Sequence, residues 1–281
     1  MSRIDQTLDR RQFLRGLGVV AAMPAIASLA ACGNSASKTE TASGTKFIVG
    51  FDQDFPPYGY VGDNGEFTGF DLELAKKVCE MEGWTYQPEA IAWDSKDAQL
   101  NSGQITCIWN GFTMEGREND YAFTSPYMEN RQVIVVAANS PIKTLADLAG
   151  KNVVTQADSA ALHLLSEGDQ KELGKTLNLT TIPEYNTAFM SLKSGEYDAI
   201  AVDLPVATFN IGESKDYAIL DEALNSEHFA VGFAKTDAGK ELAAKVEADL
   251  KKLDADGFVK QLCEKYASQG VSYSAWVLPK A

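Results

Sequence analysis

The sequence predicts an α/β fold built from two successive sets of alternating strands and helices. In the first set, an apolar run at residues 46–51 is followed by a helix-like stretch at 72–82 and by further short apolar runs. From Leu145 the alternation begins again, with new apolar runs separated by helix-like stretches. Between the two sets, residues 132–137 are almost continuously apolar, which is typical of a strand buried on both faces.

The elements of the first set have local signals. Asp63-Asn64-Gly65 is a hairpin-type turn. Asp71 has a residue type preferred at the N-cap of the helix at 72–82, which it precedes. Asn101-Ser102-Gly103 ends a short helix and leads into a buried strand at 105–109. Further strands are expected at 85–91 and 121–123, and the short helix at 96–100.

The second set and the C-terminal region follow the same pattern. Asp203 comes at a strand end, and a helix cap before Leu204-Pro205 is the structural alternative for its carboxylate. Near the C-terminus, Phe258, Leu262 and Tyr266 recur every four residues, so we expect them to form core. Strands are expected at 152–155, 180–183, 199–202 and 229–233, and helices at 186–193, 239–255 and 257–267.

The loop after the buried strand at 105–109 is a candidate binding site. Asn110 and Gly111 are turn residues, so the backbone leaves the sheet with N–H and C=O groups open to a ligand. Arg117 follows, and a guanidinium grips a carboxylate through two parallel hydrogen bonds. The alternative from spacing alone is a weak surface ion pair of Arg117 with an acidic neighbour, Glu118 or Asp120.

Residues 1–31 form a targeting segment that is kept out of the fold. Arg10-Arg11-Gln12-Phe13-Leu14-Arg15 looks like a twin-arginine export signal. The apolar stretch between Arg15 and Cys32 is shorter than the roughly 20 residues of a transmembrane helix. Leu29-Ala30-Ala31-Cys32 resembles a bacterial lipobox, so we expect cleavage before Cys32 and a lipid anchor, with acyl chains such as palmitate. Residues 32–44 are then a flexible tether at the membrane.

The charge of the chain excludes some partners. The net charge is −14, and without residues 1–31 the chain carries 21 basic and 37 acidic side chains, a net charge of −16. Such a chain repels nucleic acid, and no basic patch with interleaved aromatic residues occurs. We therefore expect no nucleic-acid partner.

Cysteine and histidine placement indicates no metal site and no cofactor. The four cysteines form no C-x-x-C pair, and His163 and His228 share no metal-ligand spacing. The sequence also contains no P-loop, H-E-x-x-H motif or nucleotide fingerprint. Apart from Cys32 the number of cysteines is odd, and we expect Cys79, Cys107 and Cys263 to be free thiols.

Three stretches, taken in order, resemble a known family. They are Gly69-Phe70-Asp71-Leu72-Glu73-Leu74, then Gly111-Phe112-Thr113 with Arg117, then Ser125-Pro126-Tyr127. Together they resemble solute-binding protein family 3, the amino-acid-binding proteins of ABC importers, from about Lys46 onward. The resemblance implies a periplasmic-binding-protein type II fold, with two mixed sheets flanked by helices in two lobes and a two-strand hinge. By this analogy lobe 1 is residues 45–130 plus 228–281, and lobe 2 is residues 131–227.

The resemblance also implies roles for residues that match the family pattern. Arg117 is expected to hold the α-carboxylate of the ligand, with Thr113 beside it and Ser159 capping it from lobe 2. Asp203 and the Gly111 carbonyl are expected to accept from the α-ammonium group.

Three further residues are expected around the ligand side chain. Phe55 and Trp93 occupy positions of aromatic walls, although core packing is an equal alternative for Phe55. Asp52 matches a position that contacts cationic side chains in basic-amino-acid binders, although members with neutral ligands also carry Asp there. Asp158 is expected to point away from the ligand carboxylate.

The implied function is an extracytoplasmic, membrane-anchored binding lipoprotein rather than an enzyme. The protein would be a monomer that binds a polar L-amino acid and closes around it by hinge motion. It would then deliver the ligand to a membrane permease and ATPase complex. Two alternatives stay open. One is an enzyme similar to cyclohexadienyl dehydratases, for which Glu115 is the obvious candidate acid. The other is a sensor partner that presents a ligand.

Overall fold

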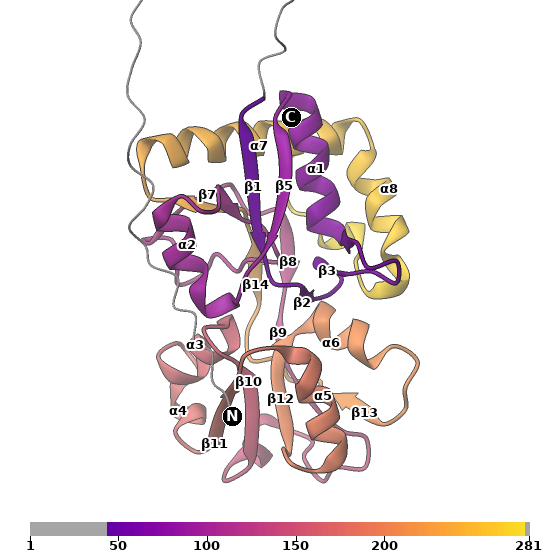
Figure 1. Cartoon of the computed structure of the whole chain (residues 1–281). Coiled ribbons are helices and arrows are strands. Elements are labelled where there is room, and N and C mark those ends of the chain that lie inside the picture. The colour runs from indigo at the N-terminus through magenta and orange to yellow at the C-terminus, as the bar shows by residue number, and fades with distance from the viewer. Residues whose placement is uncertain (1–43, 279–281) are drawn as a thin grey trace, which may run out of the picture. The chain divides into compact units, whose positions relative to one another are not determined.

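The computed structural model describes residues 44–278, so Cys32, the predicted export signal and the tether up to residue 43 lie outside it. The described chain forms two five-stranded sheets, a two-stranded sheet and a small three-stranded sheet. Figure 1 shows the two large sheets as separate bodies with the two-stranded sheet running between them. This two-lobed architecture confirms the predicted fold class.

The first large sheet has the strand order β5-β1-β6-β15-β7. Strands β1, β5 and β6 run parallel, whereas β15 pairs antiparallel with β6 and β7. Helices α1, α2 and α7 pack on this sheet, and α8 packs on α1 and α7; together they are called lobe 1 (Figure 1). Its elements are β1 Lys46–Phe51, α1 Phe70–Glu82, β5 Thr85–Ala90, α2 Lys96–Ser102, β6 Cys107–Ile108, β7 Tyr121–Phe123, β15 Gly232–Ala234, α7 Asp237–Ala255 and α8 Phe258–Lys265.

The second large sheet has the strand order β11-β10-β12-β9-β13, with β9 antiparallel to both of its neighbours. Helices α3, α5 and α6 pack on this sheet, and α4 packs on α3; together they are called lobe 2. Its elements are β9 Gln132–Ala137, β10 Asn152–Gln156, α3 Ala160–Ser166, α4 Lys171–Gly174, β11 Asn178–Ile182, α5 Tyr185–Ser194, β12 Ala199–Asp203, α6 Leu204–Ile211 and β13 Tyr217–Ile219.

Two antiparallel strands, β8 (Met128–Asn130) and β14 (Glu227–Phe229), form the hinge between the lobes. Asn130 lies opposite Glu227 in this pair, and both side chains are buried. The small sheet contains β2 (Asp54–Phe55), β3 (Gly59–Val61) and β4 (Phe67–Thr68), and the predicted turn at 63–65 joins its last two strands.

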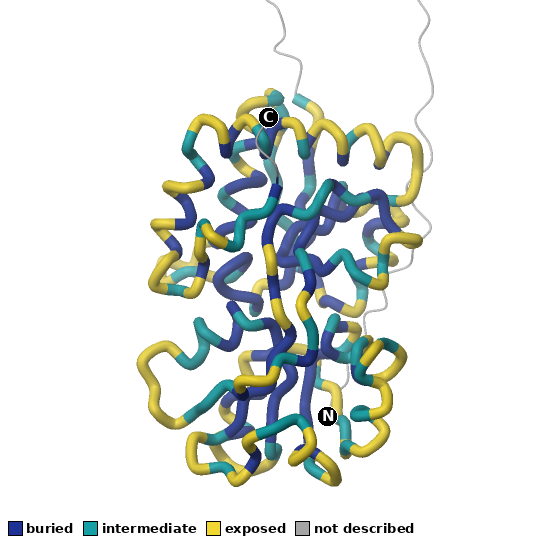
Figure 2. The backbone as a smooth tube through the Cα atoms, turned by 180° about the vertical axis from the view of Figure 1, so that it is seen from behind, coloured by how far each residue is buried: buried dark blue, intermediate teal, exposed yellow. Residues whose placement is uncertain are grey.

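The core supports the predicted burial of β9 on both faces. Val133 and Val135 belong to one apolar cluster, whereas Ile134 and Val136 belong to another on the opposite face. Figure 2 shows the strands at the centre of each lobe as buried and the outer helices as partly exposed. No helix among the described residues is long and apolar enough to span a bilayer.

The structure differs from the predicted elements at two strands. The strand expected at 105–109 shortens to Cys107–Ile108, because the Thr106 hydroxyl, instead of a backbone carbonyl, accepts from the Ile48 N–H at 3.0 Å. The apolar segment 229–233 splits between β14 and β15. Other predictions are confirmed: Leu262 and Tyr266 are buried, and the free thiols are Cys79, Cys107 and Cys263.

Candidate functional site

The buried carboxylate of Asp71 fixes the conformation of the loop after β6. Gly111 has a φ of 55°, in the region that glycine tolerates, and its N–H donates to Asp71 Oδ2 at 2.6 Å. A Cβ at Gly111 would lie 2.8 Å from Phe55 Cε1, so the aromatic ring approaches the backbone closely. The predicted pair Gly111 and Phe55 is therefore brought together.

The predicted role of Asp71 as a helix cap is wrong. Gly69 occupies the N-cap of α1, and Asp71 is the second residue of the helix, within its first turn and fully buried. Its Oδ2 accepts from Gly111 and, at 2.7 Å, from the Tyr127 hydroxyl. Burial raises the pKa of Asp71 to about 7, although these two hydrogen bonds lower it. Asp71 thus fixes the Gly111 loop from behind instead of capping its own helix.

Arg117 bridges the two lobes. Its Nη1 donates to the Thr113 carbonyl at 3.1 Å, and its Nη2 donates to the Asp158 carbonyl at 3.3 Å. The guanidinium carbon lies 5.0 Å from the centre of the Phe112 ring, a favourable cation–π distance. The ion pairs formed by residues 44–278 do not include Arg117, so the alternative of a surface pair with an acidic neighbour is wrong.

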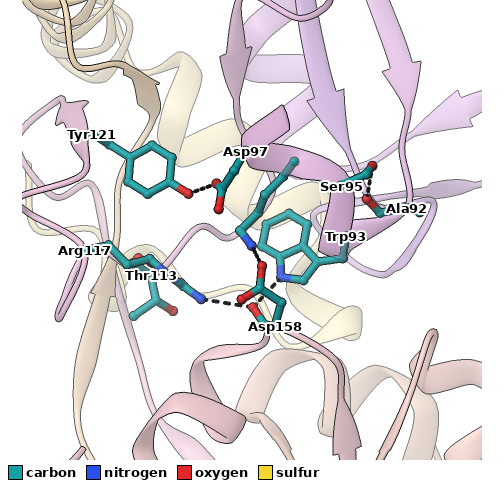
Figure 3. Close-up of polar contacts among 9 residues, drawn as sticks. Ala92, Trp93, Ser95, Asp97, Thr113, Arg117, Tyr121 and Asp158 are labelled. Atoms are coloured by element: carbon teal, nitrogen blue, oxygen red, sulfur yellow. Dashed lines mark hydrogen bonds and ion pairs between the residues drawn. The ribbon is translucent and has the colours of Figure 1, made fainter. Parts of the chain in front are cut away.

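Asp158 is the lobe 2 residue that receives the lobe 1 donors. It has a φ of 57°, and its carbonyl accepts from Trp93 Nε1 at 3.2 Å as well as from Arg117 (Figure 3). Its carboxylate pairs with Lys96, whose side chain is buried and lies 5.2 Å from the centre of the Trp93 ring. Burial lowers the pKa of Lys96, and the hydrogen bond to Asp158 raises it. The carboxylate predicted to point away from the ligand is thus turned toward Lys96.

Asp203 lies at the carboxyl end of β12 and its carboxylate does not cap α6. Its Oδ1 accepts from Asn130 Nδ2 at 2.7 Å and from Gln132 Nε2 at 2.6 Å. The same two amide groups donate to Glu227, and the Thr113 hydroxyl donates to Glu227 at 2.7 Å. Burial and the nearby Glu227 carboxylate raise the pKa of Asp203 to about 8.

Sequence reasoning missed Asn130, Gln132 and Glu227. Asn130 stands in a polar run next to Glu129 and Arg131, and Gln132 starts the otherwise apolar strand β9, so the local pattern looks like an ordinary polar connection. Glu227 likewise follows polar residues and is separated from the apolar run at Phe229 by His228. Their meeting depends on strand pairing across the hinge, which no local pattern indicates.

Asp52 lies beside a small cavity between the lobes. Its carboxylate accepts from the Asp54 N–H at 2.8 Å and from Gln156 Nε2 of lobe 2 at 2.5 Å. Burial raises the pKa of Asp52 to about 6. The cavity has a volume of about 200 Å³, and Asp52, Trp93, Asp94, Pro183 and Glu184 are among its lining residues.

Two larger cavities flank the loop of Arg117. One of about 700 Å³ is lined by Arg117, Ser159 and Lys96, and one of about 320 Å³ by Thr113, Arg117 and Glu227, among others. Ser159 is the N-cap of α3, where its hydroxyl accepts from the Leu162 N–H at 3.1 Å. The three predicted residues Phe55, Gly111 and Asp203 line none of these three cavities.

Candidate catalytic and metal groups are accounted for by internal contacts. Glu115 accepts from the His228 N–H at 2.9 Å and pairs with His228 Nδ1 at 2.6 Å. Within residues 44–278 no three His, Cys, Asp or Glu side chains are grouped so that they could hold a metal ion.

Known proteins are similar along most of the chain. The model for bacterial extracellular solute-binding proteins, family 3, matches residues 47–269, and a twin-arginine translocation signal model matches residues 7–27. The probable amino-acid-binding protein YxeM of Bacillus subtilis (strain 168) is 29% identical over 260 residues, which cover 90% of this chain and 95% of YxeM. The L-cystine-binding protein TcyJ of Escherichia coli (strain K12) is 28% identical over 229 residues, 80% of this chain and 84% of TcyJ.

Solved structures give the same result. A substrate-binding protein of a Streptococcus pneumoniae ABC uptake transporter, with bound histidine, has a TM-score of 0.75 and 30% identity and covers 81% of this chain and 94% of its own. Tv2483 bound to L-arginine has a TM-score of 0.75 and 26% identity, over 81% and 93% of the two chains. Because both the family model and these structures span most of its length, the chain belongs to the bacterial extracellular solute-binding proteins, family 3.

Proposed function

We propose that the chain is the binding protein of an ABC importer and that it holds an L-amino acid in the cleft between the lobes. Lobe 1 would span residues 45–130 and 228–281, and lobe 2 residues 131–227. The observation that carries the proposal is the separation of charge along the cleft. Arg117 lies at one end, and the carboxylates of Asp203 and Glu227 lie at the hinge end. A zwitterion has the matching charges.

At the Arg117 end, the ligand α-carboxylate would replace two backbone carbonyls. The guanidinium now donates to Thr113 and Asp158 at 3.1 and 3.3 Å, and both acceptors are neutral. A carboxylate accepts two parallel hydrogen bonds from guanidinium, and such charged bonds are shorter and about twice as strong as neutral ones. Ser159, at the start of α3, lines the same cavity as Arg117 and adds a hydroxyl from lobe 2.

At the hinge end, the α-ammonium group would donate to Asp203 and to the Gly111 carbonyl. The Gly111 N–H is held by Asp71, which fixes the orientation of this peptide group. Asp203 is 4% exposed, so a charged contact there is strengthened by the low local dielectric.

The cavity beside Asp52 supports a polar and preferably cationic ligand side chain. Its lining includes three carboxyl groups, Asp52, Asp94 and Glu184, the ring of Trp93, and no basic side chain. Carboxylates and an indole face both attract cations. Neighbouring structures with bound arginine or histidine agree with this choice. Relatives named for cystine and glutamine make a neutral polar side chain the second candidate.

We infer that the mature chain is a monomeric lipoprotein, anchored through Cys32 on the extracytoplasmic face and serving a membrane permease and ATPase. The twin-arginine signal at residues 7–27 supports export. Wild-type protein from its host should enter the detergent phase on phase separation, and Cys32→Ala should enter the aqueous phase. A fully aqueous wild type would contradict the anchor.

A binding role is favoured over an enzyme on the same scaffold. Glu115, the candidate acid, is engaged by both the N–H and the ring nitrogen of His228, so it is not free to donate a proton to a ligand. Incubation with a prephenate-like acid tests the alternative, since a dehydratase would change the absorbance. An unchanged spectrum supports binding alone.

A thermal-shift screen against the twenty L-amino acids and cystine tests the proposed function. At a hundredfold excess over Kd a ligand stabilises the folded state by about 2.7 kcal/mol. For a chain of this size we expect a rise in Tm of about 5 to 10 °C. The D-enantiomer of each hit is the matched control and should give no shift. If no L-amino acid raises the Tm of folded protein, the proposed function is wrong.

A further inference from the structure

The hinge end holds two carboxylates that share their hydrogen-bond donors. Asn130 Nδ2 lies 2.7 Å from both Asp203 Oδ1 and Glu227 Oε1. Gln132 Nε2 lies 2.6 Å from the same Asp203 oxygen and 2.8 Å from the same Glu227 oxygen. The two acidic oxygens therefore face the same pair of amide groups from β8 and β9.

The cluster has more acceptors than donors. Glu227 also accepts from Asn225 Nδ2 at 2.9 Å, and all four members of the cluster are at most 4% exposed. Asn130 Oδ1 and Gln132 Oε1 are buried and have no partner among the described residues. Turning either amide over would place its carbonyl oxygen against the carboxylates, so rotation does not correct the shortage. The cluster can therefore accept further N–H or O–H donors.

Within residues 44–278, the ion pairs do not include Asp203. The ionisable groups that face it are Glu227 and the buried hydroxyls of Tyr58, between β2 and β3, and Tyr185, at the start of α5. Burial raises the pKa of both tyrosines, so they stay neutral. Arg131 lies between Asn130 and Gln132 in sequence, but it is exposed.

The surroundings of Glu227 likewise leave its charge uncompensated. Arg117 and Asp169 line the same 320 Å³ cavity, but the Arg117 guanidinium donates to two backbone carbonyls. His228, the next residue, is held by Glu115. Two carboxylates that share a buried site do not both ionise, because each like charge disfavours the other.

We propose that Asp203, crowded by Glu227, keeps its proton in the ligand-free cleft and that the ammonium group of the ligand displaces this proton. The exchange is balanced: the pair goes from one negative charge to two, the ligand brings one positive charge, and the proton leaves to the buffer. Glu227 is then a second acidic residue of the ammonium site, beside Asp203. Burial and Glu227 raise the pKa of Asp203 to about 8, which agrees with a retained proton at neutral pH.

This inference rests on the proposed function, and titration calorimetry tests it with L-arginine, L-glutamine and L-cystine as probes. Binding is measured at pH 7 in phosphate and in Tris, which have different ionisation enthalpies, so that the difference in observed heat gives the protons released. We expect about one proton released per bound probe in wild type, since a group with a pKa near 8 is mostly protonated at pH 7. In Glu227→Gln, Asp203 loses its charged neighbour but stays buried, so the release should fall clearly below the wild-type value.

The matched control is Glu129→Gln, the same change on the exposed residue next to Asn130 in β8, which should release as many protons as wild type. The wild-type affinity gives a readout that is independent of how well Glu227→Gln folds. Between pH 7.5 and 6.0 it should weaken by about 30-fold, because one linked proton gives a factor of ten per pH unit.

The outcomes separate the inference from the proposed function. Binding without proton release, or with a pH-independent affinity, overturns the retained proton on Asp203 and leaves the amino-acid-binding function intact. Equal release from wild type and folded Glu227→Gln overturns the assignment to Glu227. If none of the probes and no amino acid in the thermal screen binds, the proposed function is wrong and the inference falls with it.

Discussion

The Arg117 end and the hinge end of the cleft hold opposite charges in very different surroundings. Arg117 is partly exposed, and each of its two N–H contacts goes to a neutral carbonyl, one in each lobe. Asp203 and Glu227 are buried on strands that meet at the hinge, and they compete for the same two amide donors. One end therefore donates to neutral carbonyls at the cleft edge, whereas the other has two carboxylates in the interior that share their amide donors.

In the proposed complex a ligand would stabilise each end differently. At the Arg117 end a charged acceptor would replace neutral ones, so the gain would come from stronger hydrogen bonds. At the hinge end a cation would offset the repulsion between buried acids that lie close together. The two ends should consequently respond differently to truncation, to pH and to loss of contacts between the lobes.

Truncating the charged residue at each end should have the largest effect. Removing one partner of a buried charge pair costs roughly 2 to 5 kcal/mol, or about 30-fold to several-thousand-fold in affinity. We expect the loss of affinity to lie near the upper limit for Arg117→Ala. It should lie near the lower limit for Asp203→Ala, because Glu227 still offers the ammonium group a carboxylate. Calorimetry on folded variants measures both.

A variant that carries both Arg117→Ala and Asp203→Ala tests whether the two contacts depend on each other. A cleft that cannot close loses both contacts together, so the two losses should not add. Arg131→Ala, which removes an exposed arginine from the hinge, is the control and should bind as wild type. Near wild-type affinity in either single variant would place the ligand elsewhere.

Asp52→Asn should change the preference between ligand side chains more than it weakens the contacts to the α-carboxylate and the α-ammonium group. Asp52 faces the side-chain cavity, and a hydrogen bond to a charged group is worth about 1.5 to 3 kcal/mol. L-arginine should therefore bind more weakly by that amount, while L-glutamine changes little. Competition between the two amino acids gives the ratio directly. An unchanged ratio would remove the argument for a cationic side chain.

The ligand-free protein should unfold more easily as pH rises from 5 to 8. Asp71 has its pKa raised from 3.8 to about 7 by burial, so the folded state binds more protons than the unfolded state in this range. Stability is then greatest at low pH within the range and is lost as pH rises through 7. The contribution of Asp71 between pH 5 and 7 is about 2 kcal/mol, at 1.36 kcal/mol per pKa unit.

Urea unfolding of wild type and Asp71→Asn measures this dependence. The variant cannot titrate at this position, so its stability should vary less with pH. Glu80→Gln, an exposed change on the same helix, should retain the wild-type slope. If the free energy of unfolding of the wild type increases from pH 5 to 7, the predicted direction of the pH dependence is wrong.

The fold was predictable where local periodicity controls it. The strands β1, β7 and β9 and the helices α5, α7 and α8 follow from apolar runs and helical spacing along the chain. The short strand β6 was not, because the Thr106 hydroxyl takes part in its ladder. Side-chain hydrogen bonds of this kind depend on which strand lies opposite.

Candidate site residues could be proposed from the sequence where the residue type indicates a chemistry. Arg117, Asp203 and Asp52 were proposed from charge, strand ends and the family pattern, and in the structure each contacts a residue at the junction of the lobes. Asp71 was misassigned and Glu227 was missed, because Gly111 and Asn130, to which they bind, lie 40 or more residues away in sequence and approach only in the folded chain.

The smallest expected effect concerns the contact between Lys96 of lobe 1 and Asp158 of lobe 2. The Asp158 side chain is 50% exposed, so solvent screens this pair and its coupling should be about 0.5 to 1 kcal/mol. Lys96→Met keeps the packing against Trp93 and should weaken ligand binding about two- to fivefold. High salt should reduce the difference from wild type.

Asp158→Asn should have a larger effect than Lys96→Met, because the Lys96 side chain is only 2% exposed and would lose its carboxylate partner in the closed cleft. Asparagine also tolerates the positive φ of this position, so the backbone geometry is kept. Lys193→Met breaks the exposed pair with Asp216 within lobe 2 and should leave affinity unchanged. If Lys96→Met also binds as wild type, the Arg117 end closes through its carbonyl contacts alone.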